Sequence, residues 1–341
     1  MTNNLPPRLQ DLPPNWAHFC LGIDNFVRQE LGLDPKKRTL LLALSGGVDS
    51  SALLLVLYYL SQKWQCRLLA AHLNHQLRPE SEAEAEAVQN LCQRLNIPLF
   101  RGSSHVRTYS RKMKKGLEEA SRTIRYRFLQ GIKVKQGADY LLTAHQLNDL
   151  AEDSLLRQIR GTGWPALAGM QAWNKDKQVL RPLLLTPKTK LQAFLQDLDI
   201  PWQEDLSNQD PAFKRNRVRN SVLPLLIGEN PAYLDKVVWL WRQARLEDSY
   251  WQEKLDELRK AEQTRGQEIL LPSNVLSTLH RALRLRWYKD ILQRMGPGQV
   301  LADTLFSLDQ AFMEDKKNKT FQFPGNKKAF IKAEGVLFIK T

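Results

Sequence analysis

Cysteine, long apolar runs and acidic residues are all scarce in this sequence. Its three cysteines, Cys20, Cys66 and Cys92, lie far apart and form no CxxC pair. We therefore expect neither a disulfide framework nor a thiolate metal cluster, and a reducing cytoplasm fits. The longest apolar runs, such as 51–60, are too short to cross a bilayer. Residues 1–14 are polar and proline-rich and lack the apolar core of a signal peptide, so we expect a cytoplasmic protein with no membrane association.

The deficit of acidic residues leaves a net charge of +14, from 50 Lys and Arg against 36 Asp and Glu. Such an excess suggests a polyanionic partner, because each phosphate contact releases counterions. A single basic cluster is equally well explained as a solvated surface, but two clusters and the high total favour a nucleic acid. The first cluster contains Arg101, Arg107, Arg111, Lys112, Lys114, Lys115, Arg122, Arg125 and Arg127, and the second contains Lys214, Arg215, Arg217 and Arg219.

The length of 341 residues predicts two domains. The first ~200 residues alternate strand and helix patterns, which indicates an α/β fold with a doubly wound parallel sheet. Asn148 is expected to cap a helix, and Thr186 and Pro187 to open a later one as its N-cap and first residue. The expected strands are 39–44, 67–74, 98–101, 139–143 and 180–185, and the expected helices include 49–62, 82–96, 116–136 and 148–159.

Beyond residue 222 the strand alternation stops. Helical patterns occupy 229–262, 274–294 and 301–313. Residues 320–340 alternate apolar and polar side chains around turn residues, which predicts a hairpin or a three-stranded ribbon.

These patterns divide the chain into an N-terminal extension (1–34), an α/β domain (35–222) and a mostly helical domain that ends in a small β-ribbon (223–341). Trp239, Trp241 and Trp287 are expected in the core of the helical part, and not as platforms for stacked bases.

The strongest local signal is a glycine loop between an apolar strand and a helix. Its residues are Ser45, Gly46, Gly47, Val48, Asp49 and Ser50. Free backbone N–H groups and the positive end of the helix meet there, which suits a phosphate. The glycines let the backbone approach a ligand closely. The alternative is a glycine turn that binds nothing.

The glycine loop is not a Walker P-loop, because it has no GxxxxGK[ST] pattern and no lysine to reach the terminal phosphates. It carries Asp49 instead. A carboxylate beside a phosphate is unfavourable unless a cation lies between them, so we infer Mg²⁺.

The glycine loop resembles the SGGxDS loop of the ATP-pyrophosphatase (PP-loop) family, which splits ATP between its α- and β-phosphates. Four further stretches resemble the lysidine synthetases within that family, and the resemblance covers roughly residues 35–225. They are HLNHQLR at 72–78, TAHQLNDLAE at 143–152, RGTG at 160–163 with LAGM at 167–170, and EDLSNQD at 204–210 with RNRVR at 215–219.

The resemblance implies an adenine-nucleotide alpha-hydrolase-like fold and a two-step ligase reaction. ATP would adenylate the C2 carbonyl oxygen of the wobble cytidine in an isoleucine tRNA with a CAU anticodon. The amine of free L-lysine would then displace AMP to form lysidine, so that the anticodon reads AUA instead of AUG. The implied partners are this tRNA and L-lysine. A second copy of the chain, in a homodimer, is a further candidate partner.

The resemblance also implies roles for single residues. The glycine loop would bind pyrophosphate, with Asp49 and Asp149 positioning Mg²⁺. Arg122 would offset charge on the adenylated intermediate, and Glu152 would receive the lysine amine or its proton. Further expected contacts are His72 and His145 for ATP, and Arg125, Lys214, Arg215, Arg217 and Arg219 for tRNA.

The acidic pair Asp149 and Glu152 has two possible roles, in ligand binding or in helix stability. Asp149 and Glu152 are spaced i, i+3 and share a helix face just after a strand, at the edge of the sheet where ligands bind. They could hold Mg²⁺ or an ammonium group, or they could simply complement the helix dipole. Many relatives have two acids where this chain has Asn148 and Asp149, so we assign the acidic role to Asp149 alone.

The histidines and arginines can likewise have either a structural or a functional role. His72, His75 and His145 lie at or beyond strand ends, and a lone histidine is more often structural than catalytic. Arg122 and Arg125 lie one turn apart and suit phosphate charge in a transition state, but a surface salt bridge would also explain either one.

The sequence disfavours three rival functions. A glutamine-dependent synthetase needs an amidotransferase half, which the chain lacks. A tRNA thiolase usually carries a catalytic cysteine pair, which is also missing. A tRNA-binding protein without activity is disfavoured by the intact glycine loop.

Overall fold

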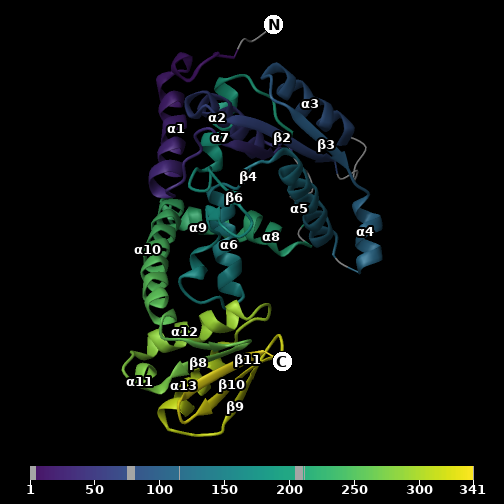
Figure 1. Ribbon diagram of the computed structural model, residues 1–341. Coiled ribbons are helices and arrows are strands. Elements are labelled where there is room, and N and C mark those ends of the chain that lie inside the picture. Colours follow the sequence, from purple (N-terminus) through teal and green to yellow (C-terminus); the bar gives the residue numbers. More distant parts are fainter. Residues whose placement is uncertain (1–4, 75–80, 115, 204–209, 211, 341) are drawn as a thin grey trace. The chain divides into compact units, whose positions relative to one another are not determined.

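The computed structural model describes residues 5–74, 81–114, 116–203, 210 and 212–340 (Figure 1). The chain forms two compact units, Met1–Arg242 and Gln243–Thr341. Among the helices of the described residues, none combines the length and apolar character that crossing a membrane would need.

The described part of unit 1 contains a six-stranded sheet with the order β3-β2-β1-β4-β6-β5. All neighbouring strands are parallel except β5 and β6. The order reverses between β1 and β4, so the sheet is doubly wound, as expected. The strands are β1 (Thr39–Ala43), β2 (Arg67–Asn74), β3 (Leu99–Ser103), β4 (Tyr140–Leu142), β5 (Trp173–Asn174) and β6 (Val179–Leu180).

Helices cover both faces of this sheet because alternate strand residues point to opposite sides. Leu40 and Leu42 pack into the core under α1, α2, α3 and α7, whereas Leu41 packs under α5. The helices of this part are α1 (Pro14–Asn25), α2 (Val48–Trp64), α3 (Ser81–Arg94), α4 (Val106–Met113), α5 (Leu117–Gln136), α6 (Leu147–Ile159), α7 (Lys188–Asp197), α8 (Lys214–Arg217), α9 (Leu223–Glu229) and the first residues of α10 (Tyr233–Arg259), which continues into unit 2.

The N-terminal segment is part of the core of unit 1. Trp16 and Phe19 of α1 pack on Phe194 of α7, and the Trp16 indole donates to Asp197 at 2.9 Å. The expected extension at 1–34 therefore contributes a helix to the α/β layers.

Several expected elements differ in the structure. The strand expected at 180–185 ends at Leu180, because a turn that contains Pro182 follows it. The helix expected at 229–262 is interrupted after Glu229, where Pro231 follows Asn230, and resumes at Tyr233. The strand expected at 98–101 lies at Leu99–Ser103, and α4 was not predicted.

The division between the units lies later than residue 222. Leu223 of α9 and Val237 and Trp241 of α10 share a buried cluster with Leu147 and Leu150 of α6. Tertiary packing therefore places α9 and the start of α10 in unit 1. The change of sequence pattern at residue 223 gives no indication of this packing.

Unit 2 has a larger sheet than expected. The predicted ribbon at 320–340 forms three antiparallel strands, and a hairpin that was not predicted extends it to the order β7-β8-β11-β10-β9. Its elements are β7 (Gln263–Arg265), β8 (Glu268–Pro272), α11 (Ser273–Leu276), α12 (Arg281–Arg294), α13 (Ala302–Met313), β9 (Thr320–Phe323), β10 (Lys327–Lys332) and β11 (Gly335–Lys340).

Two of the three tryptophans assigned to the core are buried there. Trp287 is buried in unit 2, and Trp241 is buried in unit 1, where its indole donates to the Met170 carbonyl at 2.9 Å. The prediction is wrong for Trp239, which is 59% exposed.

Candidate functional site

The glycine loop follows β1 and leads directly into α2, as the sequence predicts. Gly46 has a φ of +91°, and a Cβ there would lie 2.9 Å from Val88 Cγ2. Only glycine fits this position without strain. Gln203 N donates to the Gly46 carbonyl at 3.2 Å, which fixes the far side of the loop.

The Ser50 hydroxyl organises the interior of the glycine loop. It accepts from the backbone N–H groups of Ser45 and Gly46 at 3.2 and 3.1 Å and donates to the Gly47 carbonyl at 3.1 Å. None of the described side chains caps the first turn of α2. The N–H groups that follow Gly47 are therefore the ones best placed to receive an anion.

Asp49 lies in the first turn of α2, and its Oδ1 is buried without a hydrogen-bond partner among the described residues. Burial, and then the neighbouring Asp149 carboxylate, raise the pKa of Asp49 to about 7, while Lys188 and Arg219 oppose the shift. Two carboxylates close together, one with an unpartnered oxygen, are a donor set that fits a hard divalent cation.

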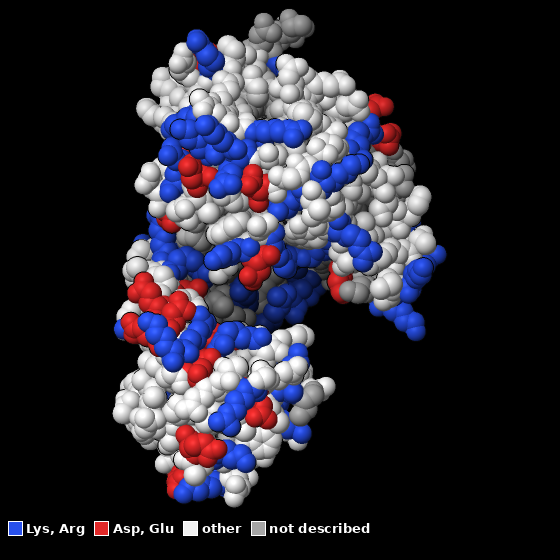
Figure 2. Space-filling model, in the orientation of Figure 1, with Lys and Arg blue, Asp and Glu red and all other residues white. Residues whose placement is uncertain are grey.

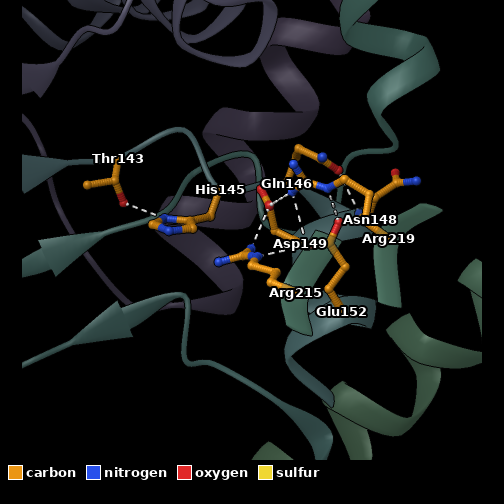
Figure 3. Close-up of polar contacts among 8 residues, drawn as sticks. All are labelled: Thr143, His145, Gln146, Asn148, Asp149, Glu152, Arg215 and Arg219. Carbon is orange, nitrogen blue, oxygen red and sulfur yellow. Dashed lines mark hydrogen bonds and ion pairs between the residues drawn. The ribbon is translucent and has the colours of Figure 1, made fainter. Parts of the chain in front are cut away.

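Asp149 closes the first turn of α6 at the carboxyl end of β4. Its Oδ2 accepts from Gln146 N at 3.1 Å, and the Gln146 side chain accepts from Asn148 N at 2.6 Å (Figure 3). Gln146, and not Asn148, is thus the N-cap of this helix, in a capping box with Asp149.

Asn148 bonds to the next helix instead. Its Oδ1 accepts from Lys188 N, the first residue of α7, at 3.3 Å. Pro187 occupies the N-cap position of α7, so the expectation that Thr186 caps this helix and Pro187 begins it is wrong by one residue. The N–H group of Lys188 is instead satisfied by Asn148, a residue forty positions earlier in the chain.

Two arginines from the second basic cluster bind both acids of α6 (Figure 3). Arg215 Nε donates to Glu152 Oε2 at 2.8 Å, and its terminal nitrogen donates to Asp149 Oδ1 at 2.7 Å. Arg219 Nε donates to Glu152 Oε1 at 2.6 Å, and its terminal nitrogen contacts Asp149 Oδ1 at 3.1 Å and Glu152 Oε2 at 3.0 Å. The Glu152 side chain is only 1% exposed.

This network changes two expectations. Both oxygens of Glu152 already accept from guanidinium groups, which does not fit the expected role as acceptor of an amine or its proton. The guanidinium groups of Arg215 and Arg219 are engaged by the acids of α6, which leaves Lys214 and Arg217 as the solvent-facing part of this cluster. Lys214 and Arg217 are exposed.

The two histidines expected to contact ATP, His72 and His145, favour the neutral form. His72 Nδ1 donates to the Leu44 carbonyl at 2.9 Å, and burial lowers its pKa. His145 Nδ1 lies 2.9 Å from Thr143 Oγ1, and burial lowers its pKa to about 4 despite the nearby Asp149. Both can therefore serve a ligand as hydrogen-bonding groups, not as charges. His75 lies outside the described residues, as does the stretch 204–209.

Arg122 and Arg125 are exposed on α5. The Arg122 guanidinium stacks over the Tyr126 ring at 5.3 Å, and its charge reaches His145. Sequence reasoning missed Arg181, which follows β6, donates to the Gln171 carbonyl at 2.7 Å and also acts on His145. Arg181 directly follows a strand, and this position in the sequence could have identified it as a candidate site residue.

The LAGM stretch has a packing role. Gly169 has a φ of +103°, and a Cβ there would lie 2.6 Å from a Leu150 methyl group of α6. Glycine is needed because this segment lies directly on the helix that carries Asp149 and Glu152.

The cysteines are poor nucleophiles. Burial raises the pKa of Cys66 to about 11 and the pKa values of Cys20 and Cys92 to about 12. Since the thiolate is the reactive form, all three are protonated near neutral pH.

We therefore predict that iodoacetamide near neutral pH reacts slowly with the folded protein and leaves its activity intact. Replacement of Cys20, Cys66 and Cys92 by serine should likewise preserve the chemistry, with some loss of stability from the buried hydroxyls. Mass spectrometry of alkylation and a turnover assay check both points. A folded triple variant without activity would revive the thiolase alternative.

Comparison with known proteins identifies relatives of this chain. The PP-loop domain family matches residues 20–226. A tRNA(Ile)-lysidine synthase of Nitratidesulfovibrio vulgaris is 42% identical over 313 residues, which cover 87% of this chain and 90% of that protein. A tRNA(Ile)-lysidine synthase of Enterococcus faecalis is 36% identical over 230 residues, 67% of this chain and 49% of that protein, so the match spans about half of the longer relative.

Among solved structures, a tRNA thiolase of Methanococcus maripaludis superimposes with a TM-score of 0.54 at 18% identity. The match covers 66% of this chain and 79% of the thiolase. At this identity the likeness shows the fold alone.

Proposed function

Because the chain belongs to the tRNA(Ile)-lysidine synthase family of PP-loop proteins, we infer that it is an ATP-dependent ligase that forms lysidine. It adenylates the wobble cytidine of isoleucine tRNA with a CAU anticodon and replaces AMP with L-lysine, which changes codon reading from AUG to AUA. One observation supports this inference most strongly. The glycine loop and the acids of α6 lie together at the carboxyl ends of the sheet strands, where the strand order reverses.

The first step activates the base. The C2 carbonyl oxygen of the cytidine attacks the α-phosphorus, and the bond from this phosphorus to the oxygen bridging to the β-phosphate breaks, which releases pyrophosphate. The first turn of α2 binds the departing phosphates through its N–H groups. Arg122 offsets the charge on the reacting phosphate.

The second step transfers the amino acid. The amine nitrogen of L-lysine attacks C2, the bond between C2 and the adenylate oxygen breaks, AMP leaves, and the amine loses a proton. Adenylation makes this possible by turning a poor leaving oxygen into a good one. The cytidine must leave its stack to reach the site.

Mg²⁺ would be held by Asp49 and Asp149, and its charge would offset that of the phosphates. The unpartnered Asp49 Oδ1 supports this choice. Arg215 and Arg219 are positioning residues in this scheme. They hold Asp149 and Glu152 in a fixed arrangement beside Asp49.

The decisive experiment is mass spectrometry of the nucleosides from unmodified isoleucine tRNA incubated with the protein, ATP, Mg²⁺ and L-lysine. We expect lysidine together with stoichiometric AMP and pyrophosphate. A sulfur-containing nucleoside would favour the thiolase alternative. Binding of tRNA without AMP formation would favour a tRNA-binding protein that lacks activity.

We propose that tRNA runs over α4 and α5 instead of over Arg215 and Arg219. Arg107 and Arg111 on α4 and Arg122 and Arg125 on α5 are exposed, and Lys and Arg side chains mark the α4 end of unit 1 at the right of Figure 2. Lys214 and Arg217 of the second cluster remain candidates for the same backbone.

The double variant Arg107→Ala and Arg111→Ala should weaken tRNA binding. It should also flatten the plot of log affinity against log salt by roughly one to two units, because each lost phosphate contact removes counterion release. The measurement is tRNA affinity from low to moderate salt.

A matched control removes the same charge elsewhere in unit 1. Lys36 and Lys37 are exposed at the amino end of β1, the sheet edge opposite to the glycine loop. Their double alanine variant should keep the wild-type slope. Equal slopes for both double variants would mean that α4 is only a solvated face.

A homodimer remains part of the proposal. Sedimentation velocity over a range of protein concentrations tests it, and a concentration-independent monomer would contradict it.

A further inference from the structure

Lys188 lies at the carboxyl edge of the sheet, although it is far from the glycine loop in sequence. The segment that contains it is tied to the start of α6 by two hydrogen bonds. Leu147 N donates to the Thr186 carbonyl at 2.9 Å, and Lys188 N donates to Asn148 Oδ1 at 3.3 Å. The backbone of Lys188 is thus bonded to Asn148, the residue that directly precedes Asp149 in the chain.

Helix packing brings the same residue to the glycine loop. α7 lies against α2, and Leu191, Phe194 and Leu195 of α7 are fully buried in the core that they share with α2. Both helices begin at the carboxyl edge, α2 at Val48 and α7 at Lys188. The charge of Lys188 consequently reaches the carboxylate of Asp49 and favours its ionised form.

The side chain of Lys188 is available to a ligand. The residue is exposed, and the described group whose charge it is seen to act on is the carboxylate of Asp49. The glycine loop itself contains no lysine, whereas a loop that binds the terminal phosphates of ATP commonly relies on one. Asp49 adds negative charge where the phosphates lie, so an ammonium group in addition to Mg²⁺ would favour their binding.

We propose that Lys188 binds the β- and γ-phosphates of ATP, and the pyrophosphate they become, and so supplies the ammonium group that the glycine loop lacks. This role rests on the proposed function, since it assigns a contact within the first step. Negative charge builds up on the leaving pyrophosphate as the bond to the α-phosphorus breaks, and a nearby ammonium stabilises that charge. AMP lacks both phosphates, so Lys188 does not contribute to AMP binding.

The test compares Lys188→Met and Lys188→Arg with the control Lys190→Met. Lys190 is exposed on the same helix, but its ammonium lies 5.0 Å from the centre of the Phe19 ring. The measured quantities are the dissociation constants of Mg²⁺-pyrophosphate and of AMP by calorimetry, and the rate of AMP formation with tRNA.

Lys188→Met should weaken pyrophosphate binding and slow AMP formation by about 10- to 100-fold each, the range for loss of a hydrogen bond to a charged group. AMP binding should not change. Lys188→Arg should restore most of the pyrophosphate affinity, and Lys190→Met should behave as wild type.

Unchanged pyrophosphate affinity in Lys188→Met would overturn the proposal. An equal loss of AMP affinity would also overturn it, because it would show that Lys188 only supports the glycine loop through Asp49. A wild-type protein that binds pyrophosphate through Lys188 but forms no lysidine would contradict the proposed function and leave the Lys188 assignment standing.

Discussion

Asp49→Asn is expected to reduce Mg²⁺-dependent AMP formation at least ~10²-fold while the chain stays folded. The carboxylate that approaches Asp149 and carries the unpartnered Oδ1 is lost, and the amide that replaces it is a weak ligand for a divalent cation. Folding should survive because burial and Asp149 already disfavour a negative charge at this position.

The measurement is AMP release with tRNA and L-lysine over a range of Mg²⁺ concentrations, with circular dichroism as the check on folding. Asp176→Asn, an exposed position on the turn between β5 and β6, is the matched control and should behave as wild type. Normal turnover by Asp49→Asn would remove Asp49 from the phosphate site.

Glu152→Gln should lose both stability and activity. The wild-type carboxylate is 1% exposed and accepts from Arg215 and Arg219. Removing one partner of a buried ion pair leaves charge uncompensated, which we expect to cost roughly 2–4 kcal/mol, because the two arginines are partly hydrated. Since the freed arginines would also shift Asp149, AMP formation should fall at least ~10²-fold.

Urea unfolding and AMP release measure the two effects separately. The double variant Glu152→Gln and Arg219→Gln should regain part of the stability, because the charge is again balanced, but not the activity. Glu229→Gln, at the exposed end of α9, serves as the control. An unaltered free energy of unfolding in Glu152→Gln would show that the arginine network does not stabilise the chain.

The family and the main features of the fold could be predicted because their signals are local. The glycine loop is contiguous, and an apolar strand before it and a helix after it suffice to indicate a phosphate site. The residues of β1 are buried on both faces, as its continuous apolar run implies. The acids of α6 share one face because the helix repeat requires it.

Errors occurred where distant segments compete for the same group. Asn148 has the right residue type for an N-cap, but Gln146 takes that position and Asn148 accepts from Lys188 N instead. The hairpin 263–272 was missed because its strands are short, and because its second strand, β8, pairs with β11, which lies more than sixty residues further along the chain.

The sequence by itself determined the chemistry on offer in this protein: a phosphate loop with an acid in place of a lysine, two further acids, and a surplus of basic side chains. Only the tertiary structure decided which of these groups meet. Arg215 and Arg219 turned out to neutralise Asp149 and Glu152, and Lys188 lies where its charge acts on Asp49. The physical reason is that charges in a partly buried site must be balanced by nearby groups, and the packing of α2, α6, α7 and α8 decides which groups are near. The spacing of residues in the sequence does not determine these distances in space.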